Sequence, residues 1–192
     1  MGFIKNANIC MEIFIMKKEK LVELIYNSAH NINSGSFYSM IFNDVENINI
    51  NTYCYSGFVL CINTISSYYK SNMKMLDTEV SDALFRSDRP IYTKIKDEPP
   101  TLYVKGCKVK NSLIADGCII RGSVENSVIG RYVEIEDDVE IKNCIILQNI
   151  RVHKGARLSN VIIDKNVDIE EGTELKGNET FPLVIEKKNL FK

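Results

Sequence analysis

The sequence predicts an α/β segment followed by a triangular parallel β-helix, a solenoid whose coils each add one short strand to each of three sheets. From Val124 to Leu175, aliphatic residues recur in steps of five, six and six, a repeat of seventeen residues. Helices and strands have side-chain periods of about 3.6 and 2 residues, so neither element produces this spacing. Each coil of such hexapeptide repeats buries its apolar edge only against its neighbours. We therefore favour a solenoid over a sandwich with coincidental spacing.

A six-residue phrase occurs four times along the same stretch. Its copies are Val109-Lys-Asn-Ser-Leu-Ile, Val124-Glu-Asn-Ser-Val-Ile, Ile141-Lys-Asn-Cys-Ile-Ile and Leu158-Ser-Asn-Val-Ile-Ile, with starts fifteen, seventeen and seventeen residues apart. The asparagines of these phrases, Asn111, Asn126, Asn143 and Asn160, are predicted to stack as a ladder along one edge. Residues that tolerate positive φ recur between the apolar pairs and predict corners after short strands: Asp138, Asn149, Gly155, Asn166 and Gly172.

Composition and charge argue against several classes of function. The 192 residues carry a net charge of -1 and no Trp, and they show no basic stripe with interleaved aromatics, which argues against a nucleic-acid partner. The first residues lack the apolar core of a signal peptide, and no apolar run approaches the roughly 20 residues of a transmembrane helix. We therefore expect a cytoplasmic protein.

The six cysteines show no paired spacing, which argues against a disulfide framework. Most of them are interpreted as small apolar residues of the interior. A zinc site is not expected, because His30 and His153 are the only histidines and neither lies near a Cys-x-x-Cys motif.

Residues 1–85 read as three strands and three helices. The run 9–16 is almost continuously apolar, which predicts a strand covered on both faces. Helices are predicted over 17–28, 36–43 and 65–76, the last capped by Thr64, and strands over 48–55 and 58–62. The opening strand needs neighbours, so the sheet is incomplete. Either residues upstream of Met1 are missing or another subunit supplies the neighbouring strands, and we favour the first.

The remaining boundaries follow from proline and from the end of the repeat. Pro90, Pro99 and Pro100 exclude a helix over 86–106, which is predicted to be an extended linker, and the β-helix is predicted over 107–192. Residues 183–185 are expected to cover the open edge of the last coil.

Several phrases in this order resemble the C-terminal half of bacterial glucose-1-phosphate adenylyltransferase, also called ADP-glucose pyrophosphorylase. They are Cys10-Met-Glu-Ile-Phe14, Ser36-Phe-Tyr38, Gly57-Phe-Val-Leu-Cys-Ile-Asn-Thr64, Ser71-Asn-Met-Lys-Met-Leu76 and Pro99-Pro100. The resemblance implies that residues 1–85 are the end of a Rossmann-like nucleotidyltransferase domain. It also implies that the β-helix is left-handed.

The same phrases depart from the family at its functional positions. Cys10, Glu12 and Ser36 stand where the family contacts the sugar phosphate, and the carboxylate of Glu12 would repel a phosphate. Cys61 stands where the family has the carboxylate that holds magnesium, and a thiol suits that hard cation poorly. The family's Gly-rich nucleotide loop has no counterpart before the first predicted strand.

This combination of a kept scaffold and lost catalytic residues resembles the non-catalytic, regulatory subunit of this family, which functions in glycogen biosynthesis. The resemblance implies that this chain alone is inactive and forms a hetero- or homo-oligomer with a catalytic adenylyltransferase subunit. Mg and ATP would then belong to that partner. The family binds anionic effectors near inter-domain surfaces, and the basic residues at this joint are Arg86, Arg89, Lys94 and Lys96.

Two alternatives stay open at this point. A hexapeptide-repeat acyltransferase would use a histidine as base, and His153 is its candidate, although its place after the inward Val152 puts it on the outer surface. An active nucleotidyltransferase with unfamiliar residues is disfavoured by Cys61 and the missing nucleotide loop. An adenylyltransferase assay separates the three readings.

Overall fold

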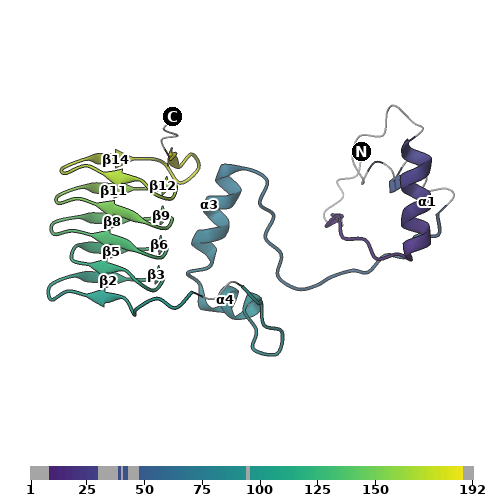
Figure 1. The fold of residues 1–192 in the computed structure, drawn as a ribbon, viewed down its shortest axis with the longest axis horizontal. Helices are drawn as coiled ribbons and strands as arrows, with labels where there is room; N and C mark the ends of the chain where they lie inside the picture. Colours follow the sequence, from purple (N-terminus) through teal and green to yellow (C-terminus); the bar gives the residue numbers. More distant parts are fainter. Residues whose placement is uncertain (1–8, 30–38, 40, 43–47, 94–95, 188–192) are drawn as a thin grey trace, which may run out of the picture. The chain divides into compact units, whose positions relative to one another are not determined.

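The computed structural model of this chain describes residues 9–29, 39, 41–42, 48–93 and 96–187 (Figure 1). The chain divides into two compact units, Met1–Ser56 and Gly57–Lys192. Each unit is described by itself below.

The first unit contains helix α1, Lys18–Ala29, close to the predicted span 17–28. Leu24 is its buried residue, and Glu19 in the first turn interacts favourably with the positive end of the helix dipole. The helix predicted over 36–43 is described only at Ser39, Ile41 and Phe42, which are helical, and its other residues lie outside the described part of the chain. Ile41 is buried, as its apolar spacing predicts.

The three strands predicted before residue 85 are absent from the described residues, so that prediction was wrong for 9–16, 48–55 and 58–62. Ile13 and Ile15, predicted to be covered on both faces, are 72% and 98% exposed. An apolar run becomes a strand only when a neighbouring strand accepts its backbone hydrogen bonds. Among the described residues these three segments join no sheet.

Two helices open the second unit. Helix α3, Ile65–Lys74, begins directly after the predicted cap Thr64 and ends two residues before the predicted Leu76. The Thr64 hydroxyl accepts a hydrogen bond from the Ser67 backbone N–H while the Ser67 hydroxyl accepts one from the Thr64 backbone N–H, a reciprocal capping box. The short helix α4, Thr78–Leu84, is capped by Asp77, which accepts a hydrogen bond from the Glu79 N–H at 3.0 Å.

The solenoid is a left-handed parallel β-helix with three five-stranded sheets. Sheet A contains β1 Leu102–Tyr103, β4 Ile119–Ile120, β7 Val133–Ile135, β10 Ile150–Val152 and β13 Asp168–Ile169. Sheet B contains β2 Lys108–Lys110, β5 Ser123–Glu125, β8 Glu140–Lys142, β11 Arg157–Ser159 and β14 Glu174–Lys176. Sheet C contains β3 Leu113–Ile114, β6 Val128–Ile129, β9 Ile145–Ile146, β12 Val161–Ile163 and β15 Leu183–Ile185. Strand β1 lies within the predicted linker, so pairing in the solenoid starts before residue 107.

The register follows the predicted repeat. Ile129 pairs with Ile146 and Ile146 with Ile163, so residue n stacks on residue n+17. The first coil is two residues shorter, since Val109 pairs with Val124. Residues 183–185 add β15 to the edge of β12, as predicted. The inward aliphatics of the three sheets form one continuous core between Cys118 and Ile169.

The corners confirm the predicted turn residues. All of them have φ between 58° and 70°: Asp138, Asn149, Gly155, Asn166 and Gly172. The four asparagines of the repeated phrase also have positive φ. Hydrogen bonds between their side-chain amides join Asn111 to Asn126 at 2.7 Å and Asn143 to Asn160 at 3.4 Å. Tyr132 takes the same left-handed conformation, which no turn preference of tyrosine predicts. Its ring lies over Gly117, where an added Cβ would be in tight contact at 3.1 Å from the ring.

No helix in the described ranges is long and apolar enough to cross a membrane.

Candidate functional site

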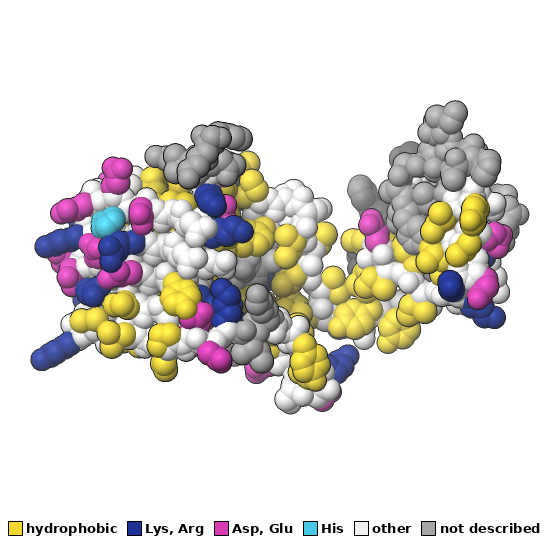
Figure 2. All heavy atoms as spheres, viewed as in Figure 1, with side chains coloured by type: hydrophobic (Ala, Val, Ile, Leu, Met, Phe, Trp, Pro, Cys, Tyr) yellow, Lys and Arg dark blue, Asp and Glu magenta, His cyan; other side chains and the backbone are white. Residues whose placement is uncertain are grey.

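Sheet C is apolar on both of its faces. Ile146 and Ile163 point into the solenoid core, while their neighbours Ile145 and Ile162 point outward and are nevertheless buried. The outer faces of sheets A and B carry charged side chains instead, and acidic and basic groups intermingle over the coils (Figure 2). Parallel sheets with two apolar faces need a cover on each. Sheet C is therefore the face of the solenoid built to bind another element.

Helix α3 provides that cover. Tyr69 is buried to 3% exposure and packs with Ile145 and Ile162, and Tyr68, Met73 and Val184 surround this second, smaller core. This contact was not predicted from the sequence. Each repeated phrase ends in two consecutive aliphatic residues, whereas a strand covered on only one face would alternate apolar and polar residues. These consecutive aliphatic residues were the sequence feature that indicated a cover on the outer face of sheet C.

The Tyr69 hydroxyl joins the helix to the asparagine ladder. It donates a hydrogen bond to the Asn143 carbonyl oxygen at 2.7 Å and lies 3.2 Å from the Asn160 side-chain oxygen. Burial, with smaller contributions from Cys144 and Glu179, raises the pKa of Tyr69 to about 12. The hydroxyl therefore stays protonated and is a hydrogen-bond donor at neutral pH.

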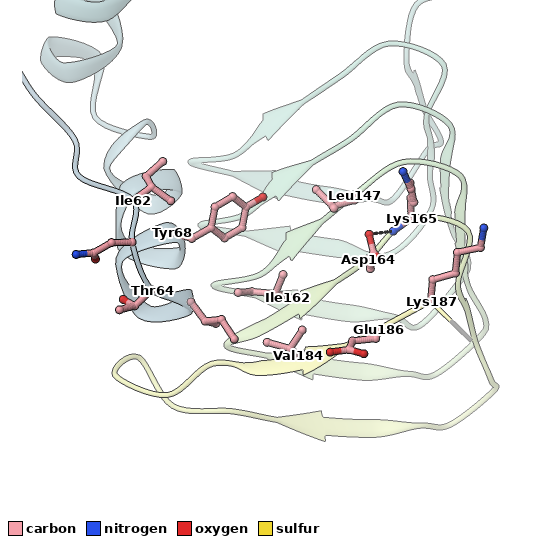
Figure 3. A pocket seen from close by; sticks show the side chains of 12 residues that line it. Ile62, Thr64, Tyr68, Leu147, Ile162, Asp164, Lys165, Val184, Glu186 and Lys187 are labelled. Carbon is pink, nitrogen blue, oxygen red and sulfur yellow. Dashed lines mark hydrogen bonds between the residues drawn. The ribbon is translucent and has the colours of Figure 1, made fainter. Parts of the chain in front are cut away.

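A groove lies between the start of α3 and the outer face of sheet C, with a volume of about 950 Å³ (Figure 3). We call it the helix groove. Its floor is apolar, formed by Leu147, Ile162 and Val184, and its α3 wall is formed by residues 62–65 and Tyr68. The opposite end is charged, with Asp164, Lys165, Glu186 and Lys187. This arrangement suits an apolar segment flanked by polar residues.

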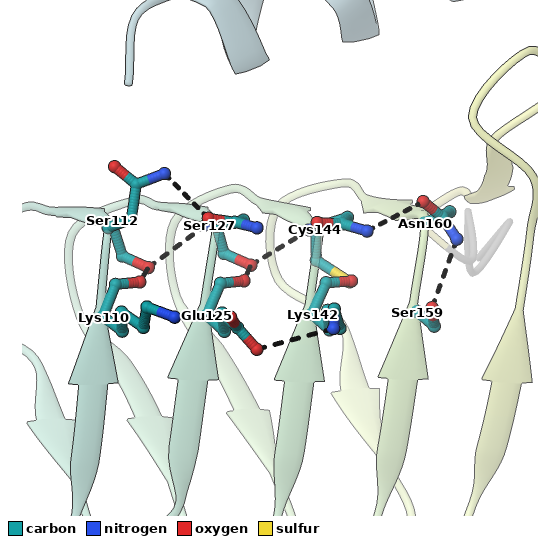
Figure 4. A network of polar contacts seen from close by, with 11 residues as sticks. Lys110, Ser112, Glu125, Ser127, Lys142, Cys144, Ser159 and Asn160 are labelled. Carbon is teal, nitrogen blue, oxygen red and sulfur yellow. Dashed lines mark hydrogen bonds and ion pairs between the residues drawn. The ribbon is translucent and has the colours of Figure 1, made fainter. Parts of the chain in front are cut away.

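A chain of hydrogen bonds supports the corner between sheets B and C (Figure 4). The Ser127 hydroxyl donates to the Glu125 carbonyl oxygen at 2.7 Å and accepts from the Cys144 N–H at 3.0 Å, so one side chain joins two coils. Ser112 does the same one coil earlier, with bonds of 2.9 and 3.2 Å. The Cys144 thiol takes the equivalent place one coil later, and burial raises its pKa to about 11.

The residues predicted at degenerate catalytic positions belong to different units of the chain. Cys10 and Glu12 are exposed in the first unit, where the Glu12 N–H contacts the Cys10 sulfur at 3.4 Å. Ser36 lies outside the described residues. Cys61 is exposed in the extended segment before α3, in the second unit.

The predicted effector residues are spread along the segment after α4. Arg86 makes a two-pronged ion pair with Asp88 at 2.8 and 2.9 Å, which lowers the pKa of the Asp88 carboxyl. This pairing already balances the Arg86 charge. Arg89 and Lys96 are exposed, and Lys94 lies outside the described part of the chain.

His153, the candidate base of the acyltransferase alternative, lies on the outer face of sheet A. Its Nδ1 is 3.1 Å from Glu136 Oε1, whose other oxygen accepts a hydrogen bond from the Lys154 N–H. The same face carries Glu134 between Arg121 and Arg151, and hydrogen bonds from both arginines lower the pKa of Glu134. His153 is therefore part of a surface ladder of ion pairs.

Within the described ranges, His, Cys, Asp and Glu side chains form no cluster of three or more that could hold a metal ion. None of the six cysteines forms a disulfide, and Cys118 and Cys144 are the buried ones. The expectation that most cysteines are interior residues was therefore wrong, because Cys10, Cys54 and Cys61 are exposed.

The coils, their register and the asparagine corners define a hexapeptide-repeat protein with a left-handed β-helix. The GlmU-like C-terminal hexapeptide family matches residues 101–180. Along its sequence, the chain is homologous to the glycogen biosynthesis protein GlgD and to glucose-1-phosphate adenylyltransferases.

The Bacillus subtilis glycogen biosynthesis protein GlgD is 39% identical over 181 residues, which are 92% of this chain and 51% of that protein. GlgD of Geobacillus stearothermophilus is 55% identical over 65 residues, 34% of this chain and 19% of that protein. The glucose-1-phosphate adenylyltransferase large subunit 2 of Hordeum vulgare is 27% identical over 139 residues, 70% of this chain and 74% of that protein. The chain thus spans about half the length of the Bacillus subtilis relative.

Proposed function

We propose that this chain acts in glycogen biosynthesis as a regulatory and assembly subunit of glucose-1-phosphate adenylyltransferase. The observation that carries the proposal is the 39% identity to a glycogen biosynthesis protein over 92% of the chain. The exposed Cys61 and Glu12, at positions where the resemblance expects a magnesium carboxylate and a sugar-phosphate contact, support a role without catalysis.

In this proposal the chemistry belongs to a catalytic partner in the cytoplasm, which would bind ATP, magnesium and glucose 1-phosphate. The present chain would bind two conformations of that partner with different affinity and so shift the balance between them. A tenfold change in the partner's affinity for an effector needs only about 1.4 kcal/mol of coupling. A surface contact of modest size is sufficient for that.

The experiment is reconstitution with the catalytic adenylyltransferase subunit of the same organism. Sedimentation of the mixture is expected to show a species heavier than either protein alone. The activator concentration for half-maximal ADP-glucose synthesis is expected to change when this chain is added. Unchanged mass together with unchanged kinetics would refute the proposal.

A second measurement addresses the chain without its partner. We expect ADP-glucose formation from ATP, glucose 1-phosphate and magnesium to stay at the buffer blank. Turnover that disappears in a Cys61→Ala variant would instead show that Cys61 belongs to a working active site.

Only the β-helix fold supports the acyltransferase alternative. His153 is held by Glu136 within the surface ladder, in a face where Arg121, Glu134 and Arg151 already satisfy one another. We therefore retain one proposed function.

A further inference from the structure

The first coil forms an open end of the solenoid. Strands β1, β2 and β3 are the outermost strands of sheets A, B and C, and no strand of the described residues pairs with their free edges (Figure 1). A free edge presents backbone N–H and C=O groups that another strand can bind. Three such edges surround this end, which we call the first-coil end.

Apolar side chains at the centre of the first-coil end are partly uncovered. Tyr103 pairs with Ile120, a core residue with 0% exposure, yet Tyr103 itself is 51% exposed. Val109 pairs in the same way with the fully buried Val124 and is 38% exposed. At the opposite end of the stack, Ile169 in β13 is only 5% exposed. Terminal coils of a solenoid need a cap, and the first-coil end is the one that needs it here.

We propose that the first-coil end binds the same end of a second copy of this chain and forms a two-fold symmetric dimer. A partner for this end must offer free strand edges around an apolar centre, and the first-coil end has that form itself. In a two-fold contact the same patch on both copies meets, so that each residue of a contacting pair occurs on both sides. The end must therefore be complementary to itself in strand direction and in charge.

The strand directions meet this condition. A two-fold axis through the middle of sheet A and the corner between sheets B and C turns the second copy over. Strand β1 then lies against β1 of the second copy, and β2 lies against β3 of the second copy. The strands follow one another in a single sense around the triangle, so turning one copy over makes all of these contacts antiparallel. Antiparallel pairing is available to any two free edges.

The charges at the corners meet the condition under the same rotation. Lys105 is exposed between β1 and β2, at the corner of sheets A and B. Asp116 is exposed between β3 and β4, at the corner of sheets C and A. The rotation exchanges these two corners, so each Lys105 faces Asp116 of the other copy, and the pair occurs twice. Complementary charge fixes the orientation of a contact, and here it favours a second copy of this chain.

Sedimentation equilibrium of the full chain over a range of concentrations tests the proposal. We expect a dimer that dissociates on dilution. Tyr103→Asp introduces a charge at the apolar centre, and this variant is expected to stay monomeric with an unchanged far-UV circular dichroism spectrum, because the position is already half exposed in a single chain. The proposal concerns this chain alone and does not depend on the role in glycogen biosynthesis.

A charge exchange tests the corner pairing. Lys105→Asp and Asp116→Lys are each expected to raise the dissociation constant of the dimer about tenfold, since each replaces two attractive pairs by two repulsive ones. The double variant restores both pairs in the opposite sense and is expected to bind nearly as tightly as the wild type. A variant that merely failed to fold could not be rescued in this way. The matched control is Glu174→Lys, an exposed charge in β14 at the opposite end of the stack, which is expected to leave the dimer unchanged.

Four outcomes would overturn the proposal. A wild-type chain that is monomeric at every concentration would leave the first-coil end without this partner. A dimer that persists in Tyr103→Asp would place the contact elsewhere. A double variant weaker than both single variants would contradict the two-fold pairing of the corners. An effect of Glu174→Lys as large as that of Lys105→Asp would assign the contact to opposite ends of two copies.

Discussion

At the scale of single residues, the two central positions of the repeated phrase have different tasks. The asparagine takes a left-handed conformation at the corner, as at Asn126 with φ 46°. The residue after it bonds backbone groups through its side chain: Ser127 joins its own coil to the next one, and the Cys144 thiol donates to the Lys142 carbonyl oxygen of its own coil. The phrase recurs because each corner must both turn the chain and satisfy backbone groups that lack a ladder partner.

Ser127→Ala tests the bridging role. The substitution removes the acceptor of the buried Cys144 N–H and the donor to the Glu125 carbonyl, and we expect the free energy of unfolding to fall by about 1–3 kcal/mol. Urea denaturation measures the change. The matched control is Ser112→Ala in the half-buried first coil, where water can replace the lost bonds, and its effect is expected to be smaller. Equal effects at the two serines would contradict the assignment.

Cys144 makes stability sensitive to alkaline pH. Burial raises the pKa of its thiol from 9.0 to about 11, so the folded protein holds this proton more tightly than the unfolded chain. The resulting stabilisation is complete below about pH 9 and is lost as pH rises toward 11. Cys144→Ser, which mimics Ser127, is expected to decrease this loss in urea titrations under reducing conditions. Some dependence will remain, because the pKa values of Cys118 and Tyr69 are also raised.

At the scale of elements, the arrangement of the second unit depends on how α3 docks on sheet C. The capping box at Thr64 and Ser67 fixes where the helix starts. The apolar contact with Ile145 and Ile162 holds it on the sheet, and the Tyr69 hydroxyl fixes its position along the asparagine ladder. Packing supplies the attraction, and the hydrogen bond supplies the register.

Tyr69→Phe separates these two contributions. The ring and its apolar contacts remain, while the Asn143 carbonyl oxygen loses its donor, so we expect a loss of about 1–3 kcal/mol in the free energy of unfolding. Tyr103→Phe, at a half-exposed ring in the first coil, is the control and is expected to change stability little. A Tyr69→Phe protein as stable as the wild type would show that packing alone positions α3.

At the scale of the whole molecule, the coils behave as interchangeable layers. Each coil pairs only with the coil above and below, and the side-chain bonds between layers span seventeen residues. Stability of such a solenoid is approximately a sum of coil and interface terms. The length of the repeat, more than the identity of any one residue, therefore determines whether the stack is in register.

Deleting residues 141–157, one complete repeat, tests this view. Leu158 then follows Glu140 and takes the place of Ile141 over Val124, so every inward residue stays inward. We expect a folded protein with a β-rich circular dichroism spectrum and a smaller denaturant m-value, since less surface is buried.

Deleting residues 142–157 is the matched control. It removes one residue fewer, so the segment after the junction turns its aliphatic side chains outward. This variant is expected to aggregate or remain unfolded. If both deletion proteins folded equally well, the register argument would be wrong.

The sequence alone determined the solenoid. The seventeen-residue spacing, the turn residues and the asparagine ladder are local repeats, and a local repeat reports which residues share a face and a corner. For the same reason, Thr64 as the start of α3 and β15 as the cover of the last coil were predictable. The resemblance in phrases such as Gly57–Thr64 indicated the relatives that the comparisons then showed.

Only the tertiary structure decided which segments of the chain contact one another. Residues 9–16 and 58–62 have the composition of strands, yet they join no sheet in the described structure, because a strand depends on a neighbouring strand that composition cannot identify. The docking of Tyr69 on Asn143 joins positions 74 residues apart in the sequence. The helix groove depends on that contact, since it exists only where α3 meets sheet C, and no spacing within either element encodes their meeting.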